Sequence, residues 1–190
     1  MPFKAWAALS RLHFFRCLAD FDYFCDQKSQ KNMGKEIEHK YLVETDVSYK
    51  RLAVEVREIK QGYISREING TVRVRITGDR ARLTIKGRTV GDTRSEFEYS
   101  IPVADAEDML HTLCEQPVIA KSRYIVPFAG NTWEVDEFHG ALEGLTIAEI
   151  EIPSSDYKYA VPAFATRNVT DDSRFYNSNL VGKSFSDLEL

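Results

Sequence analysis

Alternation between charged and apolar residues dominates the chain from residue 36 onward. Side chains two positions apart share one face of a β-strand. In residues 36–43, Glu36, Glu38 and Lys40 share one face, and apolar residues such as Ile37 and Tyr41 occupy the other. This segment therefore predicts a strand with one charged and one apolar face.

Six further segments repeat this pattern, and each places charges of one sign on the same face, two or four positions apart. Three carry basic pairs, Arg73/Arg75, Arg82/Lys86 (spaced by four) and Lys121/Arg123; three carry acidic pairs, Glu96/Glu98, Glu134/Asp136 and Glu149/Glu151. An antiparallel sheet with one solvated face is the ordinary cause of such alternation. A solvated face usually mixes charges with Ser, Thr and Gln, so repeated like-charged pairs favour charged faces that line a common interior.

A closed barrel with these faces turned inward would enclose a polar lumen. Carboxylates there could hold a divalent cation, and Arg and Lys could hold a polyanion. The apolar outer faces would then need helices to cover them. Apolar spacing predicts helices over residues 104–116, over about 46–60, and over about 172–181.

Composition limits the classes of protein that fit. The 190 residues include 25 Lys and Arg and 29 Asp and Glu, which gives a formal net charge of −4. This balance excludes a protein that binds nucleic acid through its overall charge. The 43% hydrophobic content suits a globular domain, and no apolar run is long enough to span a bilayer. Three cysteines without CxxC spacing favour a reducing, cytoplasmic location.

Residues 1–33 differ from the remainder, since they contain two of the three cysteines and no Glu. We weighed a basic amphipathic targeting or membrane-surface helix, a packed accessory helix, and translated upstream sequence. Met33-Gly34 directly precedes the first patterned strand, which favours the last interpretation. We therefore expect a dispensable extension over 1–33 and a single domain over 34–190.

The motifs together resemble the CYTH domain of the triphosphate tunnel metalloenzyme superfamily. Glu36-Ile37-Glu38-His39-Lys40 has the ExExK form that opens this domain, and the charged segments above resemble its later motifs in order. His39 stands at a position where many members have Arg, and this position lies on the outer face of the strand. The resemblance implies an α+β fold: an eight-stranded antiparallel closed β-barrel with a charged lumen and flanking helices.

The resemblance also implies an activity, namely metal-dependent hydrolysis of a triphosphate, with Mg²⁺ or Mn²⁺ and with inorganic tripolyphosphate as the leading substrate. Class IV adenylate cyclase, thiamine triphosphatase and a non-catalytic polyphosphate- or nucleotide-binding module remain alternatives. We expect a small-molecule triphosphate as the ligand, neither nucleic acid nor membrane as a partner, and a monomer or homodimer.

Residue roles carried over from the family fall into three groups. The substrate-binding positions are Lys40, Arg73, Arg75, Arg82, Lys121 and Arg123. The metal-binding positions are Glu36, Glu38, Asp136, Glu149 and Glu151. Lys86 and Tyr63 stand where some bacterial triphosphatases place a Lys–Tyr pair that helps to activate water; a phosphate clamp is the alternative for Lys86, and packing for Tyr63. The resemblance places Arg82 and Glu134 in the lumen, and it leaves Glu96 and Glu98 as either metal ligands or charge partners of the basic residues.

Overall fold

A computed structural model describes residues 37–67, 70–88 and 95–190. The chain divides into two units, residues 1–34 and 35–190, and all described residues belong to the second. The predicted extension over 1–33 thus lies outside the described residues, as does Glu36. Within the described part, no helix is long and apolar enough to cross a membrane.

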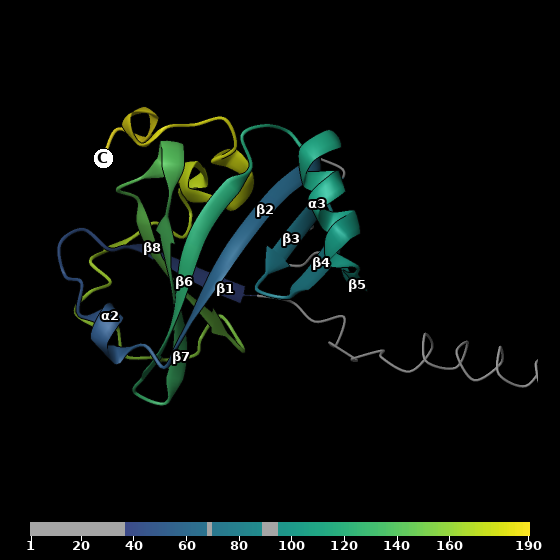
Figure 1. Cartoon of the computed structure of the whole chain (residues 1–190). Coiled ribbons are helices and arrows are strands. Elements are labelled where there is room, and N and C mark those ends of the chain that lie inside the picture. The colour runs from purple at the N-terminus through teal and green to yellow at the C-terminus, as the bar shows by residue number, and fades with distance from the viewer. Residues whose placement is uncertain (1–36, 68–69, 89–94) are drawn as a thin grey trace, which may run out of the picture. The chain divides into compact units, whose positions relative to one another are not determined.

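One antiparallel sheet forms the body of the second unit (Figure 1). Its strand order is β5-β4-β3-β2-β6-β7-β8-β1-β9, and every neighbouring pair is antiparallel. The strands are β1 (Ile37–Leu42), β2 (Glu55–Glu67), β3 (Gly70–Thr77), β4 (Arg80–Gly87), β5 (Glu96–Ile101), β6 (Ile119–Phe128), β7 (Asn131–Phe138), β8 (Thr146–Ile152) and β9 (Arg167–Asn168).

The predicted closed barrel of eight strands differs from this sheet in two respects. A ninth strand, β9, adds two residues beside β1, and the strand order runs from β5 to β9 without a pairing that joins these ends among the described residues. β9 occupies the edge of β1 that a closing strand would need, which gives a physical reason for the open order. The alternating segments predicted from the sequence nevertheless correspond to seven strands of this sheet, β1 and β3 to β8, whereas β2 was not predicted as an alternating strand.

Two of the predicted helices are shorter than expected or absent. The helix expected over 104–116 is present as α3 (Val103–Thr112). Of the helix expected over 46–60, only α2 (Tyr49–Leu52) forms, because residues from Glu55 onward pair with both β3 and β6 in the middle of the sheet. The helix expected over 172–181 is replaced by 3-10 turns η3 (Ser173–Phe175) and η4 (Asn177–Asn179); η2 (Gly140–Leu142) and η5 (Phe185–Leu188) are also 3-10 turns.

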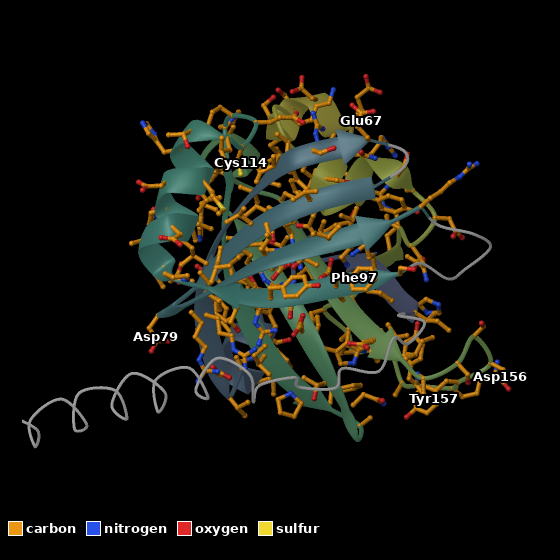
Figure 2. All side chains as sticks on the ribbon, turned by 90° about the vertical axis from the view of Figure 1, so that its right-hand side faces the viewer. Glu67, Asp79, Phe97, Cys114, Asp156 and Tyr157 are labelled. Atoms are coloured by element: carbon orange, nitrogen blue, oxygen red, sulfur yellow. The ribbon has the colours of Figure 1, made fainter. Side chains whose placement is uncertain are left out.

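Apolar side chains pack on the outer face of the sheet in two places. Around Trp133, which is fully buried, lie Tyr41, Val135, Ile150 and Phe164. On the other half of the sheet, α3 covers β3 and β4 through Leu110 and its neighbours, and Cys114, labelled in Figure 2, belongs to the same cluster. The charged faces of the strands are thereby left on the opposite, inner side.

A third apolar cluster lies at one end of the inner face. It joins strand residues such as Leu42, Phe138 and Ile147 to Phe175 and Leu180 of the C-terminal segment. These strand residues follow the charged positions by two along β1 and β7 and precede one by two along β8, so they share the charged face. The C-terminal segment therefore packs against the inner face just beyond the charged residues.

Candidate functional site

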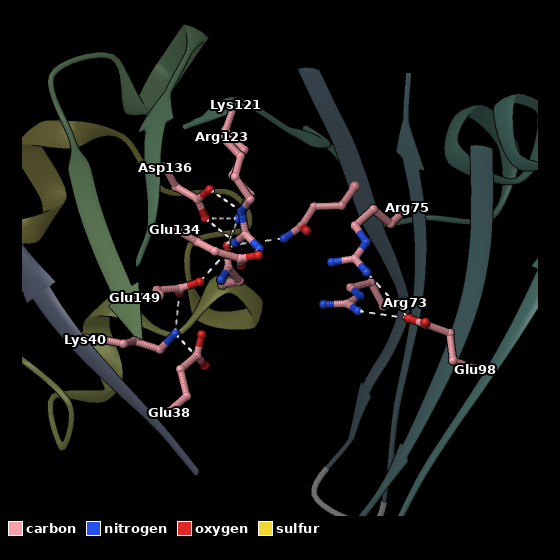
Figure 3. Close-up of polar contacts among 12 residues, drawn as sticks. Glu38, Lys40, Arg73, Arg75, Glu98, Lys121, Arg123, Glu134, Asp136 and Glu149 are labelled. Carbon is pink, nitrogen blue, oxygen red and sulfur yellow. Dashed lines mark hydrogen bonds and ion pairs between the residues drawn. The ribbon is translucent and has the colours of Figure 1, made fainter. Parts of the chain in front are cut away.

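The inner face of β1, β6, β7 and β8 carries an ion-paired cluster (Figure 3). Register places Lys40 opposite Glu149, Glu149 opposite Glu134, and Arg123 opposite Asp136. This alignment across four strands follows from the spacing of two in each segment. We call Glu38, Lys40, Lys121, Arg123, Glu134, Asp136 and Glu149 the mixed-charge wall.

Arg123 is the most heavily paired residue of the mixed-charge wall. Its Nε lies 2.6 Å from Oδ1 of Asp136, its Nη2 lies 2.9 Å from Oε2 of Glu149, and it also contacts Glu134. Burial lowers the pKa of the guanidinium, but the surrounding carboxylates outweigh this effect and hold it well above its usual value. Arg123 is thus a permanent positive charge among three acids.

Lys121 and Asp136 form the most deeply buried pair, with Nζ 2.5 Å from Oδ2 and with side chains 2% and 0% exposed. Burial lowers the pKa of Lys121 despite the carboxylate beside it. The pKa of Asp136 is lowered, since Lys121 and Arg123 outweigh the opposing effect of burial. Asp136 has no exposed surface in this arrangement, so it would need Lys121 or Arg123 to move before it could bind a metal ion.

Lys40 connects Glu38 and Glu149, with its Nζ 2.9 Å from Oε2 of Glu38 and in contact with Oε1 of Glu149. Burial and the neighbouring Glu149 raise the pKa of Glu38 to about 7. The pKa of Glu149 is instead held well below its usual value, because Lys40 and Arg123 outweigh the effect of burial. The carboxylates of Glu38 and Glu149 thus both contact the ammonium group of Lys40. A cation that prefers oxygen ligands could bind these two carboxylates in place of the ammonium group.

The second half of the inner face, on β3, β4 and β5, is predominantly basic. Arg73, Arg75 and Arg82 all lie near the carboxylate of Glu98: Nη2 of Arg73 is 3.9 Å from it and Nη2 of Arg75 is 3.5 Å from it. Burial and the nearby Arg73 and Arg123 lower the pKa of Arg75 to about 10. We call Arg73, Arg75, Arg82 and Lys86 the basic wall; Figure 3 shows Arg73 and Arg75 directed toward the interior, across from the mixed-charge wall.

A cavity of about 560 Å³ opens between the two walls at one end. Its lining includes Arg75 and Arg82 from the basic wall, Arg123 and Glu134 from the mixed-charge wall, and Arg57 of β2. The cavity lies at the end of the strands remote from the apolar cluster that contains Phe175. One end of the charged interior is thus occupied by apolar side chains, and the other is accessible.

The two residues predicted to activate water, Lys86 and Tyr63, lie on strands β4 and β2, which β3 separates. Tyr63 is 4% exposed within the apolar cluster, and burial raises the pKa of its hydroxyl. Lys86 forms an ion pair with Glu96, 2.9 Å from Nζ to Oε2. β3 separates their strands, which places the two backbones two strand spacings apart, about 10 Å.

Most of the other predicted positions lie on the same inner face. Lys40, Lys121, Arg123, Asp136 and Glu149 meet in the mixed-charge wall, whereas Arg73, Arg75 and Arg82 meet around Glu98. Glu151 lies on the inner face opposite Glu38 and is exposed. Within the described residues, no group of three or more His, Cys, Asp and Glu side chains is arranged to hold a metal ion. The acids present are instead paired with Lys and Arg, and Glu38 and Glu149 retain the oxygen chemistry that Mg²⁺ or Mn²⁺ requires.

Sequence reasoning missed three participants. Gln61 and Asn177 lie beside Lys121, whose Nζ is 3.1 Å from Oδ1 of Asn177, and the amide of Gln61 donates to the same oxygen at 3.3 Å. Thr84 accepts from Arg73 and donates to Glu98. Gln61 and Thr84 could have been found from strand register, because each stands two positions from a predicted site residue on its strand.

A family model for the CYTH domain matches residues 34–176. The chain belongs to the CYTH domain family. An inorganic triphosphatase of Acetivibrio thermocellus is 48% identical over 157 residues, covering 83% of this chain and 99% of that protein. An inorganic triphosphatase of Nitrosomonas europaea is 34% identical over 149 residues, covering 76% of this chain and 95% of that protein.

Solved structures support the same relationship. The crystal structure of the inorganic triphosphatase NE1496 aligns with a TM-score of 0.58 and 29% identity, covering 79% of this chain and 96% of that one. These relatives confirm the predicted family and show that this CYTH domain is a triphosphate-hydrolysing enzyme.

Proposed function

We propose that this CYTH enzyme hydrolyses inorganic tripolyphosphate in the charged interior, with Mg²⁺ or Mn²⁺ as cofactor. The observation that carries the proposal is the opposition of the basic wall to the mixed-charge wall on one inner face. A triphosphate chain carries several negative charges, and guanidinium groups bind phosphate oxygens through paired hydrogen bonds. The relatives named inorganic triphosphatase support this choice over a cyclase or a thiamine triphosphatase.

In the proposed mechanism, Arg73, Arg75 and Arg82 hold phosphate oxygens from one side. Lys40 and Arg123 hold them from the other, and Glu38 and Glu149 are the carboxylates that would bind the metal ion. The bound metal would neutralise phosphate charge and polarise the phosphorus toward attack by water. Binding of phosphate to Arg123 would weaken the ion pair between Arg123 and Glu149. Phosphate binding would thereby make Glu149 more available to the metal ion.

The roles of Lys86 and Tyr63 differ in this proposal. Lys86 is on the inner face beside Glu96, where its ammonium group can donate hydrogen bonds to a phosphate oxygen. It could accept a proton from water only after this ammonium group had lost a proton. Tyr63 is buried among apolar side chains, and its raised pKa keeps the hydroxyl protonated. We therefore assign to Tyr63 packing and hydrogen bonding at the inner end of the site rather than proton removal.

Release of phosphate from tripolyphosphate, ATP and thiamine triphosphate tests the proposal, with Mg²⁺, Mn²⁺ or chelator present. We expect metal-dependent release that is fastest with tripolyphosphate and falls at least 100-fold in Arg73→Ala and in Glu149→Gln. Exposed Arg51→Ala on α2, outside both walls and the cavity, is the matched control and should retain activity. Faster turnover of ATP or thiamine triphosphate would contradict the substrate assignment, and production of cyclic AMP would favour the cyclase.

A further inference from the structure

The C-terminal segment enters the interior of the sheet at the end opposite the cavity. Phe175 is fully buried and Leu180 is 1% exposed, and both pack with inner-face residues such as Ile147 and Phe138. Between them, η4 brings Asn177 to the charged interior. Figure 1 shows this segment at the ends of β6 and β8.

Asn177 contacts the charged residues through its side-chain oxygen. Oδ1 accepts a hydrogen bond from Nζ of Lys121 at 3.1 Å and one from Nε2 of Gln61 at 3.3 Å. Lys121 is 2% exposed and Gln61 is 1% exposed, so neither has solvent as an alternative partner. An amide oxygen stabilises an ammonium group without adding a charge, unlike a carboxylate.

The position of Asn177 bears on how far a polyphosphate chain can extend into the interior. Asn177 lies between Phe175 and Leu180 along the chain and bonds to Lys121. Lys121 is the last cationic residue of β6 before the apolar cluster, and Phe175 and Leu180 belong to that cluster. A polyphosphate that enters from the cavity and lies along β6 would therefore reach Lys121 and then meet the apolar side chains. Its terminal phosphate would stop at the Lys121–Asn177 contact.

We propose that Asn177 and the C-terminal segment form the inner stop that limits the length of polyphosphate this enzyme accepts, and that Asn177 positions Lys121 for the terminal phosphate. This inference rests on the proposed function and deepens it. It assigns Asn177 as a positioning and specificity-determining residue, acting through Lys121. Phosphate chains longer than the interior would have to leave their excess residues in the cavity.

The test compares hydrolysis of tripolyphosphate with hydrolysis of tetrapolyphosphate and longer chains in the full chain and in two variants. Asn177→Asp adds a carboxylate beside Lys121 at nearly constant volume, and Asn177→Ala removes the oxygen. Ser178→Ala, one position along the same turn, is the matched control. A melting curve and circular dichroism for each variant establish that it is folded.

We expect Asn177→Asp to raise the KM for tripolyphosphate about tenfold through repulsion of the terminal phosphate, with a smaller change in kcat. We expect Asn177→Ala to lower the preference for tripolyphosphate over longer chains at least threefold, while Ser178→Ala matches the unaltered protein. Folded Asn177 variants with unchanged KM and unchanged chain-length preference would overturn the inference. Absence of hydrolysis of every polyphosphate by the unaltered protein would instead refute the proposed function.

Discussion

Single residues in the two walls illustrate how far sequence alone can assign roles. Spacing of two placed Lys40, Arg123 and Glu149 on one face correctly, because alternation is a local property of extended backbone. Their partners depend on register between strands distant in sequence, which no local pattern contains. Asn177 is the clearest example, since it reaches Lys121 across 56 positions.

Glu38 gives a prediction for the dependence of stability on pH. Its pKa is about 7 in the folded protein and lies near 4.5 without burial, so the folded state binds more protons between these values. Stability should therefore fall as pH rises from about 4.5 to 7. The side chain is 35% exposed, and solvent screening reduces the expected effect to about 1 kcal/mol.

Urea unfolding of the metal-free protein at pH 5 and pH 8 measures this contribution, with Glu38→Gln as the comparison. The variant should gain about 1 kcal/mol relative to the unaltered protein between pH 5 and pH 8, because Gln does not titrate. A difference between the two proteins that is the same at both pH values would contradict the raised pKa of Glu38.

Lys121 gives a second prediction, which concerns the loss of stability when the buried carboxylate of Asp136 loses one of its two cationic partners. Lys121→Met removes the ammonium beside Asp136, a carboxylate with no exposed surface. Arg123 remains bonded to Asp136, so we expect a loss of about 2 to 3 kcal/mol in the free energy of unfolding. Chemical denaturation measures the loss, and a variant as stable as the unaltered protein would show that Arg123 alone satisfies Asp136.

Whole elements were predicted less evenly than single faces. The strands were recognisable because their alternation is strict, and α3 was recognisable from its apolar stripe. The segment 46–60 was interpreted as a helix because its apolar residues also fit a loose helical spacing. Strand pairing on both sides decided the outcome from Glu55 onward, and this tertiary contribution is invisible in one segment.

The contact between α3 and β2 yields a prediction at this scale. A Cβ atom at Gly62 would lie 2.7 Å from Cβ of Cys114 and 3.0 Å from Cδ2 of Leu110. Gly62→Ala should therefore push the end of α3 from the sheet and destabilise the protein by about 1 to 3 kcal/mol. Thermal unfolding of Gly62→Ala tests this. Equal melting temperatures for the unaltered protein and Gly62→Ala would contradict the close packing.

At the scale of the whole described unit, the two faces of the sheet differ in chemistry. Its outer face is apolar and covered by α3 and by the residues around Phe164, whereas its inner face is charged and bounded at one end by the C-terminal segment. The general arrangement followed from the sequence because one-signed pairs recur on successive strands. The open strand order and the position of the C-terminal segment did not, since both depend on how distant segments meet.

Salt dependence belongs to this scale, because the two walls act together on a polyanion. Raising the ionic strength should weaken tripolyphosphate binding, since salt screens the attraction between phosphate and the accessible Arg75 and Arg82. Isothermal titration calorimetry with tripolyphosphate at 50 mM and 500 mM KCl should show at least a tenfold rise in Kd, as an order-of-magnitude expectation. A Kd that does not change with salt would contradict an electrostatic role for the two walls.

The filled inner end of the sheet also constrains how product leaves. Because Phe175 and Leu180 occupy that end, a ligand that moves along the strands would enter and leave through the cavity at the other end. A phosphate released nearest Lys121 would be trapped behind the remaining diphosphate until that fragment departs. Cleavage at the outer phosphate would instead free the small product first, so the blocked end makes the order of release depend on which bond is broken.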